Sequence, residues 1–220
     1  MNGCSTSSTA FIISEHLVNL MTDMTHHLPK GHEHTGKSSK DLLDVELILR
    51  ETSLKKGNTF LDIGSGEGFF SIAASKIIGK RGRVYAVDNY KESIDVLREQ
   101  ITRDNIINIE AIVADVTKKI PLGEQVIDVG LMVNVLHGFF ANSEIDGTMR
   151  EVARVIKNGG ILAIVDFKAI EGSHGPPVSI RLSPHETEEW ITPYGFRARN
   201  VLDVGQHHYM VIFDKVAEKT

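Results

Sequence analysis

The chain has 220 residues, of which 41% are hydrophobic and 24% are charged, and its formal net charge at pH 7 is −5. These proportions are ordinary for a globular protein in water, and the negative charge argues against an electrostatic nucleic-acid binder. No apolar stretch reaches about 18 residues and no charged-then-apolar leader precedes a cleavage site, so we expect neither membrane insertion nor export. The single cysteine, Cys4, forbids an internal disulfide and favours the reducing cytoplasm.

Residues 1–40 are rich in Ser, Thr, His and Gly, and we expect them to form an N-terminal histidine-rich arm or lid before a domain over residues 41–220. Half of the ten histidines lie in this arm: His16, His26, His27, His32 and His34. Neutral imidazoles bind zinc, nickel and copper, but no cysteine lies near these histidines and no helical H-x-x-x-H spacing occurs. We therefore expect a polar lid that orders over substrate, and we assign no metal ligand.

From residue 41 the apolar pattern predicts a helix that ends near Gly57, followed by alternating strands and helices. The expected strands are 59–63, 83–88, 109–114, 126–134 and 160–167, and the helices between them lie near 68–79, 91–103 and 143–157. Asn158-Gly159-Gly160 is a strong signal for the end of the last of these helices. Such alternation predicts an α/β fold with a mainly parallel sheet and helices on both faces.

The C-terminal part departs from this alternation. Ser183, Pro184 and Glu186 have the spacing of a capping box with proline in the first turn, so we expect a helix to begin there. Two extended runs, 196–204 and 208–216, are joined by a turn near Gly205. They predict an antiparallel pair of strands.

The most informative motif is T-F-L-D-I-G-S-G-E-G-F-F, which runs from Thr59 to Phe70. Glycines at 64, 66 and 68 let the chain turn sharply after a buried strand and bring bare backbone close to a ligand. Asp88 ends the next strand, roughly 20 residues on, where dinucleotide-binding folds place an acid that accepts hydrogen bonds from ribose hydroxyls. The order of strand, glycine turn, helix, strand and acid predicts a nucleoside-cofactor site.

The glycine spacing indicates which cofactor fits. A nicotinamide site has G-x-G-x-x-G before a helix that faces a diphosphate, whereas here the third glycine comes one residue early and Glu67 would repel a diphosphate. The sequence D-I-G-S-G-E-G instead resembles motif I of the class I methyltransferases that depend on S-adenosylmethionine (SAM), a cofactor without phosphate. The alternatives are a nicotinamide oxidoreductase and a purely structural turn.

This resemblance covers about residues 41–216. It implies a Rossmann-like, seven-stranded, mostly parallel sheet with a C-terminal antiparallel hairpin, helices on both faces, and SAM as cofactor. It also implies the cofactor-binding residues, which are Asp62, Gly64, Ser65, Gly66, Asp88, Asn89, Asp115, Val116 and Asn134. By resemblance, Asp62 orients the glycine loop and Asp88 binds the ribose. Asp115 accepts a hydrogen bond from the adenine amino group, while the next residue flanks the ring; an ordinary turn carboxylate is the alternative for Asp115.

Residues that could act on the acceptor follow the fourth and fifth strands, because the carboxyl ends of such strands face the ligand crevice. His137 could serve as a general base near neutral pH, or it could be a hydrogen-bonded structural histidine. Asp166 ends the fifth strand and His174 lies in the loop that follows, where either could select substrate or take a proton, with simple loop hydration as the alternative. The catalytic candidates are thus His137, Asp166 and His174. Around Asn134 there is no Asn-Pro-Pro-Tyr motif, which argues against methylation of base amines or glutamine amides.

These observations predict a SAM-dependent methyltransferase with a small-molecule acceptor, similar to the ubiquinone/menaquinone C-methyltransferase branch. Arsenite methyltransferases are also similar but rely on several cysteines, so the single Cys4 disfavours that activity. The alternative is a SAM-binding or metal-binding module without turnover that uses the histidine-rich arm. Neither the acceptor atom nor the oligomeric state follows from the sequence.

Overall fold

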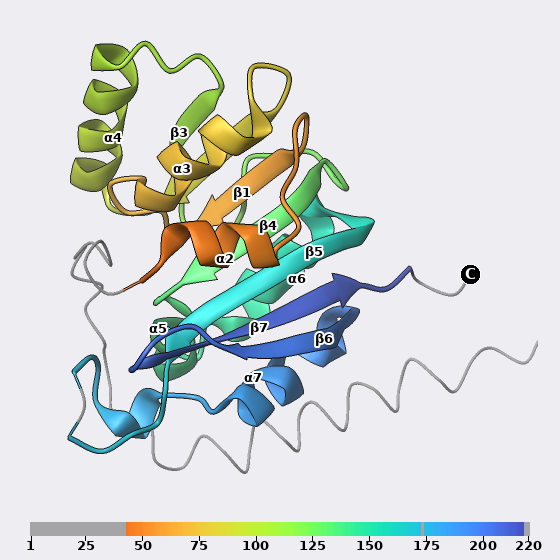
Figure 1. Cartoon of the computed structure of the whole chain (residues 1–220). Coiled ribbons are helices and arrows are strands. Elements are labelled where there is room, and N and C mark those ends of the chain that lie inside the picture. The colour runs from red at the N-terminus through yellow and green to blue at the C-terminus, as the bar shows by residue number, and fades with distance from the viewer. Residues whose placement is uncertain (1–42, 173, 218–220) are drawn as a thin grey trace, which may run out of the picture.

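A computed structural model describes residues 43–172 and 174–217 of the chain (Figure 1). The predicted arm over residues 1–40, with its five histidines, lies outside the described residues. In the described part, no helix combines the length and the apolar composition that crossing a bilayer requires.

The described residues build one seven-stranded sheet with the strand order β3-β2-β1-β4-β5-β7-β6. The strands are β1 (Thr59–Ile63), β2 (Arg83–Asp88), β3 (Ile109–Val113), β4 (Ile127–Val133), β5 (Ile156–Phe167), β6 (Phe196–Asp203) and β7 (His208–Lys215). β1 to β5 pair in parallel, whereas β7 is antiparallel to both of its neighbours, β5 and β6. The predicted fold class, including the C-terminal antiparallel hairpin, is confirmed.

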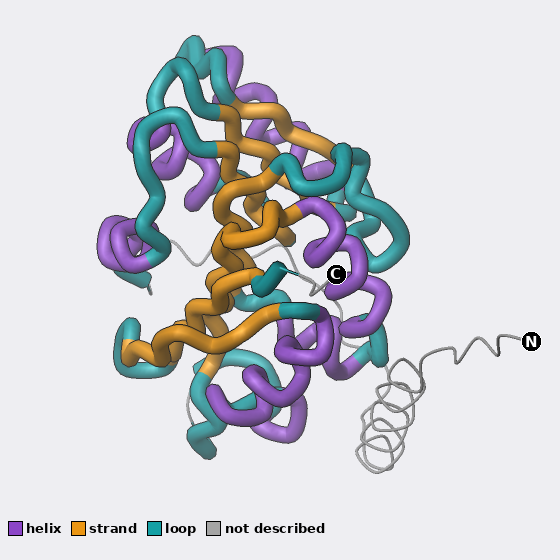
Figure 2. Tube along the Cα trace, turned by 90° about the vertical axis from the view of Figure 1, so that its right-hand side faces the viewer, coloured by secondary structure: helices purple, strands orange, loops and turns teal. Residues whose placement is uncertain are grey.

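Helices cover both faces of this sheet (Figure 2). They are α2 (Val45–Glu51), α3 (Phe69–Ile78), α4 (Lys91–Arg103), α5 (Leu136–Ala141), α6 (Ile145–Val155) and α7 (Pro184–Ile191), with short 3₁₀ turns at Val178–Ile180 and Thr192–Tyr194. Two separate apolar clusters show the division: one contains residues of α2, α3 and α4, and the other contains residues of α5, α6 and α7. The sheet therefore lies between two helical layers.

The strand sequences explain why both faces are buried. Successive side chains of a strand point to opposite faces. In β1, Phe60 packs in the cluster of α2, α3 and α4, while Leu61 and Ile63 pack in the other cluster, and all three are fully buried. A strand that buries both faces is apolar at successive positions, as β1 is at Phe60, Leu61 and Ile63; the buried Asp62 interrupts this run.

Two local predictions were wrong. The helix expected over 143–157 is α6, two residues shorter at each end, and the strand expected from residue 160 begins at Ile156. Ile156 pairs with Ile127 of β4, and the register shifts just beyond this pair. An added Cβ at Gly160 would lie 2.8 Å from Cγ2 of Ile156. The two glycines therefore lie inside a continuing strand, near its shift of register, and not at the end of a helix.

The second difference concerns the end of β4. The strand expected over 126–134 is β4, which ends at Val133, but the helix α5 that follows it and contains His137 was not predicted. Asn134 links them with a left-handed φ of 57°, a conformation that asparagine tolerates better than most residues. The predicted capping box before α7 is confirmed, since the Ser183 hydroxyl accepts from the Glu186 amide and the Glu186 carboxylate accepts from the Ser183 amide.

The topology determines where a ligand can bind. From β1 the chain moves to β2 and then to β3 on one side, and β4 returns to the other side of β1. The strand order therefore reverses between β1 and β4. In open α/β sheets the crevice at this point, beyond the carboxyl ends of the strands, is where ligands bind.

Candidate active site

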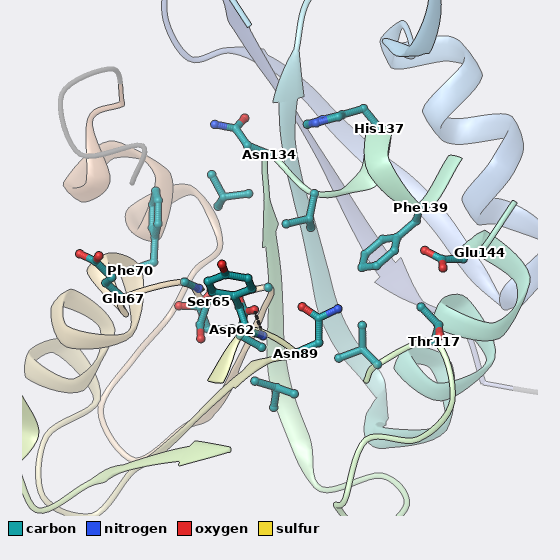
Figure 3. Close-up of a pocket in the computed structure, with 18 of the residues that line it drawn as sticks. Asp62, Ser65, Glu67, Phe70, Asn89, Thr117, Asn134, His137, Phe139 and Glu144 are labelled. Atoms are coloured by element: carbon teal, nitrogen blue, oxygen red, sulfur yellow. Dashed lines mark hydrogen bonds between the residues drawn. The ribbon is translucent and has the colours of Figure 1, made fainter. Parts of the chain in front are cut away.

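A cleft of about 720 Å³ lies at the carboxyl ends of β1, β2, β3 and β4 (Figure 3). Every residue predicted to bind the cofactor lines it, as do the catalytic candidates His137 and His174. The third candidate, Asp166, lies behind the wall and bonds to His137. The fold thus brings the predicted residues together, although they are spread over more than 100 positions of the sequence.

The glycines of the loop after β1 have different tasks, although all three adopt positive φ. An added Cβ at Gly64 would lie 2.5 Å from Cγ1 of Val135, and one at Gly68 would lie 2.4 Å from Cδ1 of Leu97. At Gly66 an added Cβ would meet no described atom within 4 Å. Gly64 and Gly68 therefore permit close packing within the protein, whereas Gly66 leaves its backbone open to the cleft.

Two polar groups of this loop region fit a bound ligand. The Ser65 hydroxyl oxygen is shielded from solvent and has no hydrogen-bond partner among the described residues. Buried polar atoms nearly always have a partner, so this hydroxyl, which lines the cleft, suits a polar group of the cofactor. Asp88 accepts hydrogen bonds from the amides of Gly66 and Tyr90, each at 2.8 Å. Each carboxylate oxygen can accept a second bond, so Asp88 can hold the loop and a ribose hydroxyl together.

Asp62 lies beneath the loop and is only 2% exposed. One carboxylate oxygen accepts the Ser71 hydroxyl at 2.6 Å, which joins β1 to α3. Burial raises the pKa of Asp62 to about 7, the Ser71 hydrogen bond opposes this shift, and the nearby charge of Asp88 adds to it. The pKa of Asp62 is thus strongly perturbed, and Asp62 lies in a cleft. Residues with such perturbed pKa values are common at functional sites.

Asp115 and Val116 follow β3 at the other end of the cleft. Asp115 accepts the amide and the hydroxyl of Thr117 at 3.0 and 2.6 Å. It also pairs with Lys118 at 2.8 Å, and that ion pair and the Thr117 bonds lower the pKa of Asp115. Asp115 therefore makes the contacts of a turn carboxylate, which was the alternative interpretation of the sequence. These contacts hold a charged hydrogen-bond acceptor at the rim of the cleft. Val116 is 6% exposed and contributes an apolar surface beside it.

His137 and Asp166 form a buried pair that the sequence did not predict as a pair. Nδ1 of His137 lies 2.7 Å from Oδ1 of Asp166, and the His137 amide donates to Oδ2 at 3.0 Å. The Phe167 amide also donates to Oδ1, at 2.8 Å. The side chains are 6% and 4% exposed. Figure 3 shows the imidazole pointing from α5 toward Asn134.

Aromatic residues were the main omission of the sequence interpretation. Tyr90, Phe139 and Phe167 line the cleft, each within two residues of a predicted site residue. Phe139 points from α5 into the cleft in Figure 3. The available signal was position: aromatic residues beside polar ones at the carboxyl ends of parallel strands are well placed to contact a flat ligand.

The charges of the lining residues test the choice of cofactor. The cleft is lined by five acidic side chains, Asp62, Glu67, Asp88, Asp115 and Glu144, and the described lining contains neither Lys nor Arg. Such a surface repels a diphosphate and attracts a cation such as a sulfonium or an ammonium group. The site therefore fits SAM and opposes the nicotinamide alternative. Within residues 43–172 and 174–217, no cluster of three His, Cys, Asp or Glu side chains is arranged to hold a metal ion.

Comparison with known proteins agrees with this geometry. A family described as "Methyltransferase domain" matches residues 54–215. The ubiquinone/menaquinone biosynthesis C-methyltransferase UbiE of Neisseria meningitidis is 30% identical over 125 residues, which are 55% of this chain and 49% of that protein. A "Probable cobalt-precorrin-6B C(15)-methyltransferase (decarboxylating)" of Sulfolobus acidocaldarius is 27% identical over 137 residues, or 58% of this chain and 65% of that protein. The chain spans about half the length of the UbiE relatives that it matches.

A solved structure extends the similarity to the whole domain. The SAM dependent methyltransferase from Aquifex aeolicus superposes with a TM-score of 0.75 at 31% identity, over 82% of this chain and 95% of that one. The sequence identity, the coverage and the shared fold lead to the same conclusion as the cleft, which suits a cationic nucleoside cofactor. The chain therefore belongs to the class I SAM-dependent methyltransferases, and its cofactor is SAM.

Proposed function

We propose that this protein transfers a methyl group from SAM to a small-molecule acceptor, with His137 as the general base and Asp166 as the residue that orients it. The observation that carries the proposal is the buried His137–Asp166 pair at the wall of an acid-lined cleft. The names of UbiE and the precorrin protein, which describe methylation of small molecules, support the acceptor class.

The cofactor residues divide by position along the cleft. We place the ribose at Asp88, the adenine between Asn89 and Val116 with its amino group toward Asp115, and the methionine part along the loop that contains Ser65 and Gly66. Asp62 supports this loop from below, and the cationic end of the bound cofactor favours the charged form of its carboxyl group, whose pKa is about 7 in the free protein. Asn134, at the end of β4, contacts the methionine part. Support comes from the common cleft, from the open backbone of Gly66 and from the Ser65 hydroxyl, which has no hydrogen-bond partner in the described part of the chain.

SAM, when bound, supplies an electrophilic methyl group on a positively charged sulfur that leaves as a neutral thioether. The protein has to align the acceptor and exclude water, which can by itself accelerate a reaction greatly. Because Asp166 accepts the Nδ1 proton of His137, the neutral ring carries its lone pair on Nε2. An acceptor that arrives protonated gives its proton to Nε2, and Asp166 stabilises the resulting imidazolium.

The remaining parts of the proposal concern the whole chain. We place residues 1–40 as an arm or lid that precedes the methyltransferase domain over 41–220 and contacts the acceptor rather than a metal. His174, at the exposed rim of the cleft, contacts the acceptor as well. The single Cys4 supports a cytoplasmic location.

The test is a transfer assay with methyl-labelled SAM and fractions of a small-molecule extract, in which mass spectrometry identifies the labelled product. We expect label in a low-molecular-mass product with the wild type and at least about 100-fold less with His137→Ala. His185→Ala is the matched control, because His185 is exposed on α7. If SAM binds in calorimetry but no fraction accepts label, the chain is a SAM-binding module without turnover and the proposed function is wrong.

A further inference from the structure

Arg181 follows the 3₁₀ turn at Val178–Ile180 and is buried, with 6% of its surface exposed. Among the described residues of the segment after β5, its guanidinium group donates to the backbone carbonyls of four. The acceptors are the carbonyl oxygens of Lys168 at 3.0 Å, Ile170 at 3.3 Å, His174 at 3.3 Å and Pro176 at 2.6 and 2.8 Å. A buried cation that donates hydrogen bonds to several carbonyls of one loop fixes the path of that loop.

The same segment forms one wall of the cleft. We call Phe167, His174, Gly175 and Pro176 the acceptor wall, since all four line the cleft at the end of β5 or in the segment that follows it. This wall belongs to different elements from the glycine loop, Asp88 and Asp115, which follow β1, β2 and β3. A residue that controls this wall can therefore affect the acceptor without touching the cofactor.

Phe167 connects Arg181 to the proposed general base. The guanidinium carbon of Arg181 lies 5.5 Å from the centroid of the Phe167 ring. The ring also packs against His137, edge-on at 5.9 Å between centroids, and against His208 at 4.3 Å. An added Cβ at Gly175 would lie 2.6 Å from the Phe167 ring, so the loop backbone is in close contact with it. Arg181 thus holds both the loop and the ring that packs beside His137.

We infer that Arg181 is a positioning residue that sets the acceptor wall and thereby determines which acceptors the enzyme takes. This inference rests on the proposed function. Lysine cannot substitute, because an ammonium group is a point charge with three donors, whereas the planar guanidinium presents five N–H groups in a fixed fork. The inference separates Arg181 from the cofactor residues: its loss should disturb acceptor binding and leave SAM binding intact.

The test uses Arg181→Lys, with Arg199→Lys as the matched control, since Arg199 is an exposed arginine paired with Asp214 on the edge hairpin. We expect Arg181→Lys to bind S-adenosylhomocysteine within about twofold of the wild type and to raise the acceptor KM by about tenfold, with a smaller change in kcat. We also expect a Glu-specific protease to cleave after Glu171, which is exposed in this loop, about tenfold faster in the native protein. Arg199→Lys should change none of these quantities.

Gly175→Ala provides a second, independent disturbance of the wall if Arg181→Lys does not fold. Its Cβ would push the loop away from Phe167 without removing the guanidinium, so the acceptor KM should again rise while S-adenosylhomocysteine binds normally. Equal loss of acceptor and cofactor binding in both variants, or no change in either, overturns the inference. If the wild type methylates no acceptor, the proposed function fails separately, and an unchanged cleavage rate after Glu171 would then overturn the role of Arg181 in the loop.

Discussion

The carboxylate of Asp88 accepts a hydrogen bond from the amide of Gly66 at 2.8 Å, so the acid that ends β2 is tied to the turn that follows β1. Two features that the sequence presents as separate parts of a motif are thus one structural unit. A change at either residue should disturb the position of the other.

Asp88→Ala is expected to weaken SAM binding by about 1–3 kcal/mol, because the variant loses the proposed charge-assisted hydrogen bond to the ribose and the bond to the Gly66 amide. Isothermal titration calorimetry measures the change. Asp95→Ala, on the exposed side of α4, is the control and should bind SAM normally. Unchanged affinity in Asp88→Ala would show that the ribose lies elsewhere.

Alanine at Gly66 and at Gly68 should have different consequences. Both positions have positive φ, which costs an alanine roughly 1–2 kcal/mol. Gly68→Ala should lose more stability than this, because its Cβ also overlaps Leu97, and the difference is measurable by urea unfolding. Gly66→Ala has room within the protein but fills space that the cofactor needs, so its larger defect should be in SAM affinity. Equal stability losses and equal affinities in the two variants would contradict this division of tasks.

Asp62 should make the protein less stable as the pH rises. The pKa of Asp62 is about 7 in the folded protein against 3.8 for an ordinary aspartate, so between these values the folded state holds a proton that the unfolded state has lost. The destabilisation is absent below pH 3.8, grows through this window and is complete above pH 7, where it reaches at most about 4 kcal/mol.

Asp62→Asn keeps an oxygen that can accept the hydrogen bond of the Ser71 hydroxyl, and it removes the contribution of Asp62 to the pH dependence of stability. Urea unfolding at pH 5 and pH 8 should therefore show a smaller loss of stability in the variant than in the wild type. Asp95→Asn is the control, because the pKa of Asp95 is lowered and Asp95 does not titrate in this range. The same pH dependence in Asp62→Asn and the wild type would refute the assignment.

Asp166→Asn tests how His137 is oriented. The amide cannot stabilise an imidazolium and favours the wrong tautomer, so we expect kcat to fall by about 100-fold or more. The affinity for SAM should stay the same, since Asp166 lies behind the wall. Asp203→Asn, at an exposed ion pair with Lys168, is the matched control. A loss of SAM affinity equal to the loss in kcat would indicate a structural role for Asp166.

Much of the fold could be predicted because local patterns agree with the tertiary structure. The bounds of β1 and β2 match the apolar runs, and the capping box at Ser183 begins α7. Where long-range pairing competed with a local signal, the prediction failed. Asn158-Gly159-Gly160 reads as a helix stop, but Ile156 already pairs with Ile127, and no local pattern reveals such a partner.

In the candidate site, too, features set by local pattern could be predicted and features set by long-range contacts could not. The grouping of Gly66, Asp88 and Asp115 around one cleft could be predicted, because these residues follow the carboxyl ends of neighbouring strands. The pairing of His137 with Asp166 depends on the left-handed turn at Asn134 and on the length of β5, which the sequence pattern did not specify. Arg181 was missed for a similar reason: an isolated arginine in a loop reads as a solvated charge, and its four carbonyl partners are apparent only in three dimensions.

The position of β7 has a consequence for biosynthesis. β7 follows β6 in the chain but inserts between β5 and β6, and its centre, from Tyr209 to Phe213, is at most 2% exposed. While residues 208–215 are still within the ribosome, the apolar edge of β5 cannot be covered by its native neighbour. We therefore expect the nascent sheet to present an unpaired apolar edge until residues 208–215 have left the ribosome, and chaperone binding would protect the edge in this interval.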